Sequence, residues 1–315
     1  MMKRILKAFS NPSMALCYLI ECSHLFDGMS DEKYLKMIWR IKFGTKLNFD
    51  DPQTFTEKLQ WLKLYDRKPE YTNLVDKYEV KKIVGDKIGE QYIIPTLGVW
   101  NTVDEIDWGS LPQQFVLKTT HGSDSGGVVI CKDKSTFDQK AAMKKLSKSM
   151  KGNVYRSLRE WPYKNIKKRI IAETYLNDSG TFEGQNATPK DEQLKDYKFY
   201  CFGGEPKFML IASNRFTTHN FNYYDMEFNK LPLTSAVGSQ AEMVFEKPEQ
   251  FDEMKKIATI LSQGFAHIRV DLYCSGGKVY FGELTFYDSS GYDNFSSEEW
   301  NKQCGDWIKL PEKTL

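Results

Sequence analysis

The chain has 315 residues, a length that suggests about two domains with room for a large buried core. Apolar residues make up 41% and aromatic residues 14%, which argues against disordered and fibrous classes. The 44 lysines and arginines nearly balance the 42 aspartates and glutamates, so the formal charge of +2 is too small for the dense basic face that general nucleic-acid binding requires. We therefore expect a globular protein without a nucleic-acid partner.

The six cysteines are scattered along the chain, and no two of them have Cys-x-x-Cys spacing. The four histidines are also dispersed, so a zinc site would have no cluster of ligands. A disulfide framework would be unusual in a chain of this length. Reduced thiols in a cytoplasmic enzyme are expected.

The first 20 residues combine a basic start with apolar positions. The apolar stretch at 14–20 is shorter than a membrane span and has no small-residue cleavage site after it, so a helix is expected rather than a secretory signal. A helix packed on the protein's own body is favoured because Pro12 interrupts the pattern. The alternative is a basic amphipathic segment that docks peripherally on the inner face of the membrane.

Residues 1–75 are expected to be mostly helical. The segments 33–43 and 55–65 each place apolar side chains near one face of a helix. Thr54 and Glu57 have the spacing of a capping box at the start of the second helix.

Beyond residue 75 the sequence predicts both helices and strands. Two elements come first, and short strands separated by glycines follow them. These two are a helix over 76–88, ended by Gly89, and a buried strand over 93–100. The later strands are expected over 115–119, 127–131, 169–174, 197–202, 207–213, 267–273 and 278–285, with helices over 136–150 and 251–264 and a loop over 179–194. This order favours an α+β fold over a regularly alternating parallel sheet.

The most informative motif is FVLKTTHGSDSGGVVI at 115–130, which has the pattern of a strand, a glycine-rich turn and a second strand. Gly122, Gly126 and Gly127 would let backbone amides approach an anion, and Lys118 would add a compact positive charge. The hairpin therefore suits a cover over phosphates. It is neither a Walker loop nor a dinucleotide fingerprint, and an ordinary β-hairpin is the alternative.

A second informative segment is 267–286, in which two strands are joined by Ser-Gly-Gly. Alternation places Arg269 and Asp271 on one face of the first strand, and Phe281 and Glu283 on one face of the second. A three-residue turn would put Glu283 opposite Arg269 and diagonal to Asp271.

Two neighbouring carboxylates repel each other unless a cation lies between them, and oxygen ligands suit Mg²⁺. Asp271 and Glu283 therefore predict a magnesium site beside nucleotide phosphates, with Arg269 holding the phosphate that is transferred. The alternative is a surface hairpin with solvated charges and a plain Arg269–Glu283 cross-strand pair.

A third segment, 169–176, is an apolar strand that ends near Glu173. Backbone groups of 174–176 could meet an adenine edge, with Glu173 accepting a hydrogen bond from the exocyclic amine. A core strand that simply ends there explains the pattern equally well. Lys198 lies within a strand pattern, which is usual for a lysine at an exposed edge.

Taken together and in this order, these segments resemble the ATP-grasp superfamily. The resemblance is closest to its TupA-like branch, which is linked to teichuronopeptide biosynthesis and bacterial surface polysaccharides. It is carried by PQTFTEKLQW at 52–61, DKY at 76–78, FVLKTTHGS at 115–123, DYK at 196–198 and FGELTF at 281–286. The first and last of these strings are the more specific to the branch.

The resemblance implies an ATP-grasp fold, in which two α+β lobes enclose ATP after a helical N-terminal region. The implied division has a helical region at 1–75, a linking helix and strand at 76–114, a small lobe at 115–176 and a large lobe at 177–315.

The resemblance also implies roles for individual residues. The set expected to bind ATP is Lys77, Lys118, His121, Gly122, Ser123, Gly126, Gly127, Glu173, Thr174, Tyr175, Leu176 and Lys198. Lys118 and Arg269 would be catalytic, and Asp271, Glu283 and Thr285 would ligate Mg²⁺. Many relatives have Asn where this chain has Thr285, which offers only a hydroxyl oxygen, so the number of metal ions stays open.

The reaction implied by the resemblance is the activation of a carboxylate by ATP, as an acyl phosphate that an amine attacks. In a polysaccharide setting the partners would be a sugar-acid acceptor and an amino acid. A kinase with a hydroxyl acceptor is an alternative. So is a glycosyltransferase, although the chain lacks the Asp-x-Asp string common in metal-dependent members of that class. A binding module without catalysis is disfavoured because Lys118, Arg269 and both carboxylates are all present.

Overall fold

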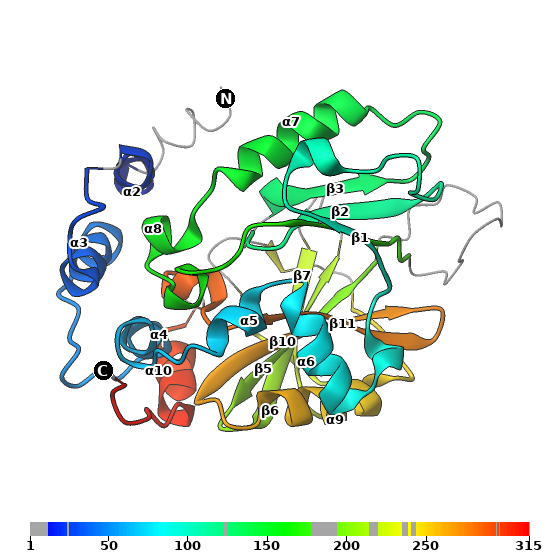
Figure 1. Cartoon of the computed structure of the whole chain (residues 1–315). Helices are drawn as coiled ribbons and strands as arrows, with labels where there is room; N and C mark the ends of the chain where they lie inside the picture. Colours follow the sequence, from blue (N-terminus) through cyan, green and yellow to red (C-terminus); the bar gives the residue numbers. More distant parts are fainter. Residues whose placement is uncertain are drawn as a thin grey trace.

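The computed structural model describes residues 12–23, 25–122, 125–177, 194–213, 220–234, 239–240, 244–293, 295 and 297–314. Within these ranges the strands form a four-stranded and a seven-stranded sheet, both built almost entirely from antiparallel pairs. In Figure 1 the small sheet and its helix α7 lie above the large sheet, and several helices gather on the left. The predicted α+β fold with two lobes is confirmed.

The helical start of the chain is confirmed from residue 12 onwards. Its helices are α2 (Pro12–Ser23), α3 (Asp31–Phe43), α4 (Phe55–Tyr65) and α5 (Tyr71–Val75). Helix α2 begins at Pro12, and the residues before it, over which the predicted interruption would be judged, lie outside the described residues. Leu16, Tyr18 and Leu19 of α2 are exposed. Across the described part of the chain, no helix has both the length and the apolar character needed to cross a bilayer.

The capping box of α4 is present as predicted. The Thr54 side chain accepts a hydrogen bond from the backbone N–H of Glu57, and a Glu57 carboxylate oxygen accepts one from the backbone N–H of Thr54 at 2.9 Å. Helix α4 packs against α10 (Glu298–Trp307), a helix that the sequence did not reveal. Its apolar residues are only Trp300, Cys304 and Trp307, which pack in the core at helical spacing, and the sequence analysis overlooked this short pattern.

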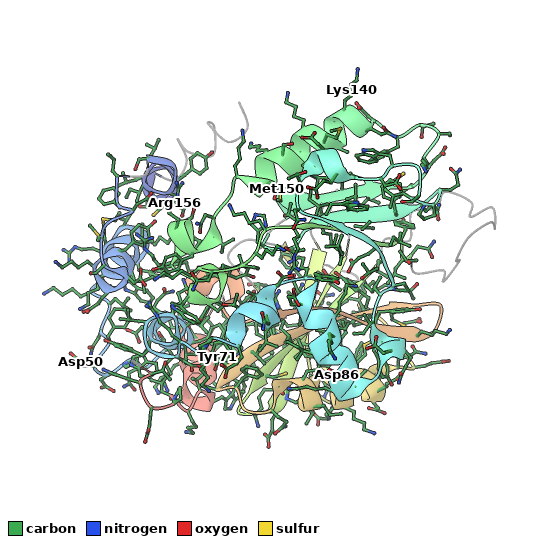
Figure 2. All side chains as sticks on the ribbon, in the orientation of Figure 1. Asp50, Tyr71, Asp86, Lys140, Met150 and Arg156 are labelled. Atoms are coloured by element: carbon green, nitrogen blue, oxygen red, sulfur yellow. The ribbon has the colours of Figure 1, made fainter. Side chains whose placement is uncertain are left out.

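The small sheet has the strand order β1-β4-β2-β3, and its strands are β1 (Thr96–Trp100), β2 (Phe115–Thr119), β3 (Val128–Cys131) and β4 (Ile170–Thr174). Helix α7 (Gln139–Met150) covers one face, where Leu146 packs with Phe115 and Leu117. Lys140 of α7 points away from the sheet (Figure 2). The strand predicted over 93–100 is present as β1, but its predicted burial is wrong, because β1 is an edge strand whose side chains are exposed or half-buried.

The large sheet has the strand order β11-β10-β5-β6-β7-β8, with β9 beside β7. Its strands are β5 (Asp196–Phe202), β6 (Glu205–Ser213), β7 (Asn220–Asp225), β8 (Lys230–Leu231), β9 (Ser239–Gln240), β10 (His267–Ser275) and β11 (Lys278–Thr285). Helix α9 (Phe251–Ser262) buries Phe251 and Met254 against this sheet. Strand β7 escaped prediction because its asparagines and aspartate are poor strand formers, although Asn222 is buried.

The remaining elements lie before, between or after these strands along the chain. They are α6 (Glu79–Ile88), α8 (Val154–Leu158) and the 3₁₀ turns η1 (Glu90–Tyr92), η2 (Val103–Glu105), η3 (Ser125–Gly127), η4 (Trp161–Tyr163) and η5 (Asp288–Gly291). The predicted elements that match helices or strands agree with them to within three residues at each end. The loop predicted over 179–194 lies, apart from its last residue, outside the described residues.

The predicted register of the β10–β11 hairpin is wrong. The turn contains two residues, Gly276 and Gly277, both with positive φ, so Ser275 pairs with Lys278. A bulge next to Gly282 then places Glu283 opposite Asp271.

The same bulge separates the faces of Phe281 and Glu283. Phe281 pairs with Leu272 and packs in the core, whereas Glu283 lies opposite Asp271. A Cβ atom on Gly282 would lie 2.9 Å from the Asp271 carbonyl oxygen, so the bulge depends on a glycine there.

The contact between α4 and α10 gives a stability prediction. A Cβ atom on Gly305 would lie 2.2 Å from the Gln53 carbonyl oxygen, in backbone that cannot rotate away. Gly305→Ala should lower the free energy of unfolding by about 1–3 kcal/mol, measured by urea denaturation. Gly28→Ala is the matched control, because its Cβ would meet nothing within 4 Å. Equal stability of the two variants would contradict this packing.

Candidate active site

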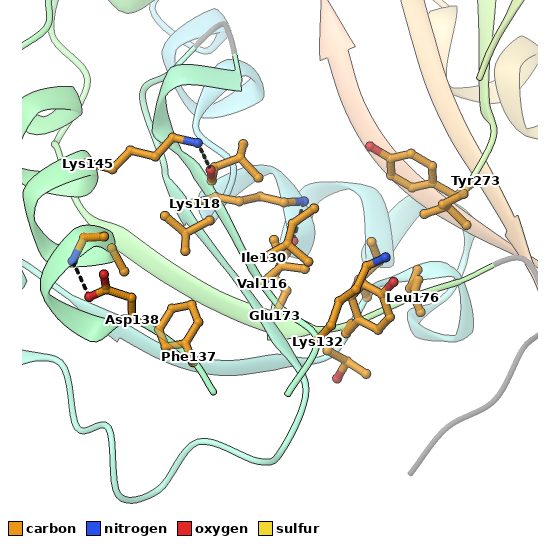
Figure 3. Close-up of a pocket in the computed structure, with 18 of the residues that line it drawn as sticks. Val116, Lys118, Ile130, Lys132, Phe137, Asp138, Lys145, Glu173, Leu176 and Tyr273 are labelled. Carbon is orange, nitrogen blue, oxygen red and sulfur yellow. Dashed lines mark hydrogen bonds and ion pairs between the residues drawn. The ribbon is translucent and has the colours of Figure 1, made fainter. Parts of the chain in front are cut away.

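A cavity of about 710 Å³ opens between the small sheet and one end of the large sheet. Val116 and Lys118 of β2 lie on one side of it, and Tyr273 of β10 lies across from them (Figure 3). Small-molecule ligands occupy pockets of roughly 300–1,000 Å³. The cavity therefore has the size of a nucleotide site.

Glu173 of β4 is buried at the wall of this cavity and contacts two lysines. Its carboxylate lies 2.6 Å from Lys118 Nζ and 2.6 Å from Lys81 Nζ, which comes from α6. Burial alone would raise the pKa of Glu173, but the two ammonium groups hold it at about 2. Burial lowers the pKa of Lys81, the Glu173 carboxylate opposes this effect, and the nearby Lys118 ammonium adds to it. Glu173 is thus ionised and fixes the position of Lys118.

The residues predicted to meet adenine follow Glu173 along the cavity. Thr174, Tyr175 and Leu176 all line it, and Leu176 packs with Ile94 in a small apolar cluster. The Thr174 N–H donates to the Pro95 carbonyl, so this segment is held against the start of β1. An apolar wall next to backbone amides is suited to a planar heterocycle.

A row of charged side chains crosses the large sheet next to the cavity. Lys198, Asp271 and Glu283 lie opposite one another on β5, β10 and β11. Asp196, two residues before Lys198, lines the cavity and lies opposite Tyr273. Lys198 forms an ion pair with Asp271 and lies 3.4 Å from Asp196. The expectation of an exposed edge lysine is wrong, because β5 is a central strand and Lys198 is only 7% exposed.

Arg269 lies beside this row, two residues before Asp271 on β10. Its Nε and Nη2 atoms donate to the two carboxylate oxygens of Asp271 at 2.7 and 2.8 Å. Nη2 also donates to the hydroxyl of Thr285, the residue opposite on β11, at 3.1 Å. Nη1 donates to Asp288. Burial would lower the pKa of Arg269, but the two carboxylates hold it well above the usual value.

Lys77 joins the glycine-rich turn to the charged row. Its Nζ donates to the Gly122 carbonyl at 2.7 Å and to a Glu283 carboxylate oxygen at 3.1 Å. Close packing would raise the pKa of Glu283, but Lys77, Lys198 and Arg269 hold it well below the usual range. The Glu283 side chain is 33% exposed, whereas that of Asp271 is 1% exposed, so Glu283 is the carboxylate that a ligand from solvent can reach.

The glycine-rich turn is close to Lys77, but its side chains face different ways. His121 is buried and directed towards α7, with Nε2 3.2 Å from the Ser149 carbonyl. Burial lowers the pKa of His121, so the side chain is neutral. A Cβ atom on Gly127 would lie 2.2 Å from Thr119 Oγ1, so a glycine is needed there for packing. Gly126 lies in η3, and Ser123 lies outside the described residues.

The two carboxylates fit a Mg²⁺ ion that takes its other ligands from phosphates and water. Such ions use only one or two protein carboxylates. Within the described ranges no group of three or more His, Cys, Asp and Glu side chains could hold a metal alone. Asp271 and Glu283 lie directly opposite each other, and Thr285 Oγ1 accepts from Arg269 beside them. In this structure protein cations neutralise both carboxylates.

The structure thus brings most predicted residues together in two adjoining groups. One contains Lys118, Glu173 and residues 174–176 in the cavity, and the other contains Lys77, Lys198, Arg269, Asp271, Glu283 and Thr285. The roles of these residues stay predictions.

Four residues of the site were missed by the sequence analysis: Lys81, Asp196, Tyr273 and Asp288. Asp196 had a signal, because it alternates with Lys198 on one strand face. Asp288 had none, since its position depends on a turn.

The charge on Glu173 predicts acid sensitivity. Its pKa is about 2 in the folded protein and about 4.3 in an unfolded chain, so its stabilisation is present above about pH 4.3 and is lost as the pH falls towards 2. Glu173→Gln should lower the free energy of unfolding by roughly 3 kcal/mol at pH 7, and the difference from wild type should shrink below pH 4. Urea denaturation at several pH values measures this. A difference that does not vary with pH would contradict the ionised carboxylate.

Comparison with known proteins adds a family and a set of distant structures. A family model described as TupA-like ATPgrasp matches residues 57–309. No curated protein matches the sequence. The D-alanine–D-alanine ligase of Bacillus anthracis, solved with ATP, is 16% identical with a TM-score of 0.38, and the match covers 68% of this chain and 54% of that one.

Two further solved structures are similarly distant. The D-alanine–D-alanine ligase of Coxiella burnetii is 12% identical with a TM-score of 0.40, covering 82% of this chain and 64% of that one. The ATP-grasp ligase PsnB, solved with its minimal precursor, Mg and ADP, is 10% identical with a TM-score of 0.36, covering 73% and 57%. The chain spans less than two thirds of the length of each of these three proteins.

The family match extends over residues 57–309, well over half of the chain. It includes both sheets, the cavity and the charged row. The resemblance found in the sequence is therefore confirmed, and the chain belongs to the TupA-like ATP-grasp family.

Proposed function

We propose that the protein is an ATP-dependent ligase that activates a carboxylate as an acyl phosphate and joins it to an amine. The observation that carries this proposal is the continuity of the cavity with the charged row. Asp196 lines the cavity and lies 3.4 Å from Lys198, which in turn pairs with Asp271. A nucleotide with its base in the cavity would have its phosphates beside Lys198, Arg269 and the two carboxylates.

The reaction has two steps. An oxygen of the acceptor carboxylate forms a bond to the γ-phosphorus of ATP as the bond to the bridging β–γ oxygen breaks, which releases ADP. The amine nitrogen then attacks the carbonyl carbon of the acyl phosphate, phosphate leaves, and the nitrogen loses a proton. The products are ADP, phosphate and an amide, and no protein nucleophile is needed.

The side chains of the site would act by positioning and by neutralising charge. Lys118 is held by Glu173 at the cavity, and Lys77 is held between the glycine-rich turn and β11. Arg269 lies at the far end of the row, where a transferred phosphoryl group would be. A bound Mg²⁺ ion, held by Asp271 and Glu283, would add charge neutralisation at the phosphates.

The acceptor and the setting are proposed from the branch of the family. A sugar-acid carboxylate of a surface polysaccharide and an amino acid are the partners that fit the chemistry. The work would take place in the cytoplasm, peripherally at the inner face of the membrane. Leu16, Tyr18 and Leu19, exposed on α2, are apolar side chains available for such a contact.

The reaction type can be tested by trapping the acyl phosphate. With ATP, Mg²⁺ and a pool of uronic-acid oligosaccharides, hydroxylamine should yield a hydroxamate and ADP when amino acids are withheld. Lys118→Ala and Arg269→Ala should each reduce trapping by about 10²–10³, because each removes a cation from the transferring group. Lys140→Ala, an exposed lysine on the outer side of α7, is the control that should leave trapping unchanged.

Other products would identify other enzymes. A phosphorylated hydroxyl that resists hydroxylamine would identify a kinase, and sugar transfer without ATP consumption would identify a glycosyltransferase. Either result would overturn the ligase proposal.

The metal assignment gives a separate prediction. Glu283→Gln keeps the shape of the side chain but removes the more accessible charge of the pair, which Asp271 cannot replace. Activity should fall by at least about 10², whereas ADP binding without Mg²⁺, measured by calorimetry, should be nearly unchanged. Glu205→Gln, on the exposed surface of β6, is the control. Normal activity of Glu283→Gln with Mg²⁺ would exclude this metal site.

A further inference from the structure

Two polar side chains of α4 are completely buried and point to one turn. Gln60 and Lys63 are both 0% exposed. Gln60 Nε2 donates to the carbonyls of Ser290 and Gly291 at 3.0 and 2.8 Å. Lys63 Nζ donates to the carbonyl and the hydroxyl of Ser290, both at 2.6 Å, and to the Leu158 carbonyl at 3.1 Å. Buried polar groups with this many partners fix the position of the backbone that they bind.

The turn that they hold has an unfavourable backbone conformation. Ser289, Ser290 and Gly291 have φ values of 46°, 56° and 66°, in the left-handed region that residues other than glycine rarely adopt. A Cβ atom on Gly291 would lie 2.5 Å from Gln60 Nε2, so Gly291 is also needed for the contact with α4. Two successive serines in this conformation need support from their surroundings, and Gln60 and Lys63 give that support.

The residue that the turn presents is Asp288, at its first position. Its carboxylate accepts hydrogen bonds from Arg269 Nη1 and, at 2.8 Å, from the Tyr200 hydroxyl. Tyr200 lies opposite Arg269 on the neighbouring strand β5. Asp288 thus reaches the guanidinium from outside its own hairpin.

These contacts use all but one of the N–H groups of Arg269. A guanidinium has five N–H groups. Asp271 accepts from Nε and Nη2, Thr285 accepts from Nη2, and Asp288 accepts from Nη1. One Nη1 N–H has no partner among the described residues. Asp271 fixes the plane of the group and Asp288 fixes which Nη1 hydrogen stays available.

We propose that Asp288 is a positioning residue for Arg269, and that Gln60 and Lys63 of α4 hold the turn that presents it. The inference rests on the ligase function proposed above, in which Arg269 contacts the transferred phosphoryl group. The inference also assigns a structural role to the helical motif at 52–61. Besides capping α4 and binding α10, this motif connects the N-terminal helices to the charged row.

The test begins with Asp288→Asn, which keeps the size of the side chain and removes its charge. We expect kcat for ATP cleavage to fall about 10- to 100-fold while KM for ATP changes less than about threefold, because misplacing Arg269 affects the transferring group more than the bound nucleotide. A readout without turnover is calorimetric binding of ADP and Mg²⁺ with and without aluminium fluoride, which mimics the transferring phosphoryl group. The gain in affinity from aluminium fluoride should be lost in the variant, and ADP affinity should not change.

A pair of variants on α4 separates positioning from stability. Gln60→Met removes the two hydrogen bonds to the turn. Thr56→Val is the matched control, because Thr56 is a buried polar residue of the same helix that binds Asn301 of α10 instead. Both variants should lower the thermal midpoint, but only Gln60→Met should lose the aluminium fluoride effect. Combined with Asp288→Asn, it should add little further loss.

The outcomes distinguish the inference from the function on which it rests. If the wild type turns over ATP and Asp288→Asn behaves like the wild type, the positioning role of Asp288 is overturned and the ligase function is not. A faster Asp288→Asn would also overturn it, since Asp288 would then compete with the phosphoryl group for Arg269. A wild type without ATP turnover, but with aluminium fluoride binding that depends on Asp288, would remove the ligase reaction and support the positioning role.

Discussion

The arrangement of the site depends on one electrostatic constraint: charges that are shielded from water must be paired. Asp271 is almost completely buried, and Lys198 and Arg269 surround it. Burying any of these charges without its partner would be energetically costly. Each charge of the row therefore needs an opposite charge next to it. A ligand could supply that charge in place of a protein side chain. Substrate phosphates and a metal ion are charges of this kind.

Two supports keep this row in position relative to the rest of the molecule. From the side of the small sheet, Lys77 joins the Gly122 carbonyl to Glu283. From the other side, α4 holds the turn that carries Asp288. The glycine-rich turn and the N-terminal helices, far apart in the sequence, therefore meet the same few charges.

The sequence was sufficient for the parts that local patterns encode. Strand alternation and glycine turns located β2, β3 and β11, and the capping box located the start of α4. It was insufficient where several distant segments decide the outcome. The burial of Lys198 follows from the central place of β5 in the sheet, and the approach of Asp288 to Arg269 follows from a turn that α4 stabilises. Neither the strands on both sides of β5 nor the contact of α4 with the turn can be seen in the sequence around Lys198 or Asp288.

The hairpin register shows how small a feature decides the chemistry. With a regular two-residue turn and no bulge, the pairing Ser275–Lys278 would continue, and Gly282 would lie opposite Asp271. Glu283 would then alternate onto the core face, where Phe281 and Leu272 pack, since side chains in a strand point to opposite faces in turn. One extra residue at Gly282, allowed by the missing side chain, moves Glu283 to the face of Asp271 and Lys77. The carboxylate pair thus exists because of a glycine that contributes no functional group of its own.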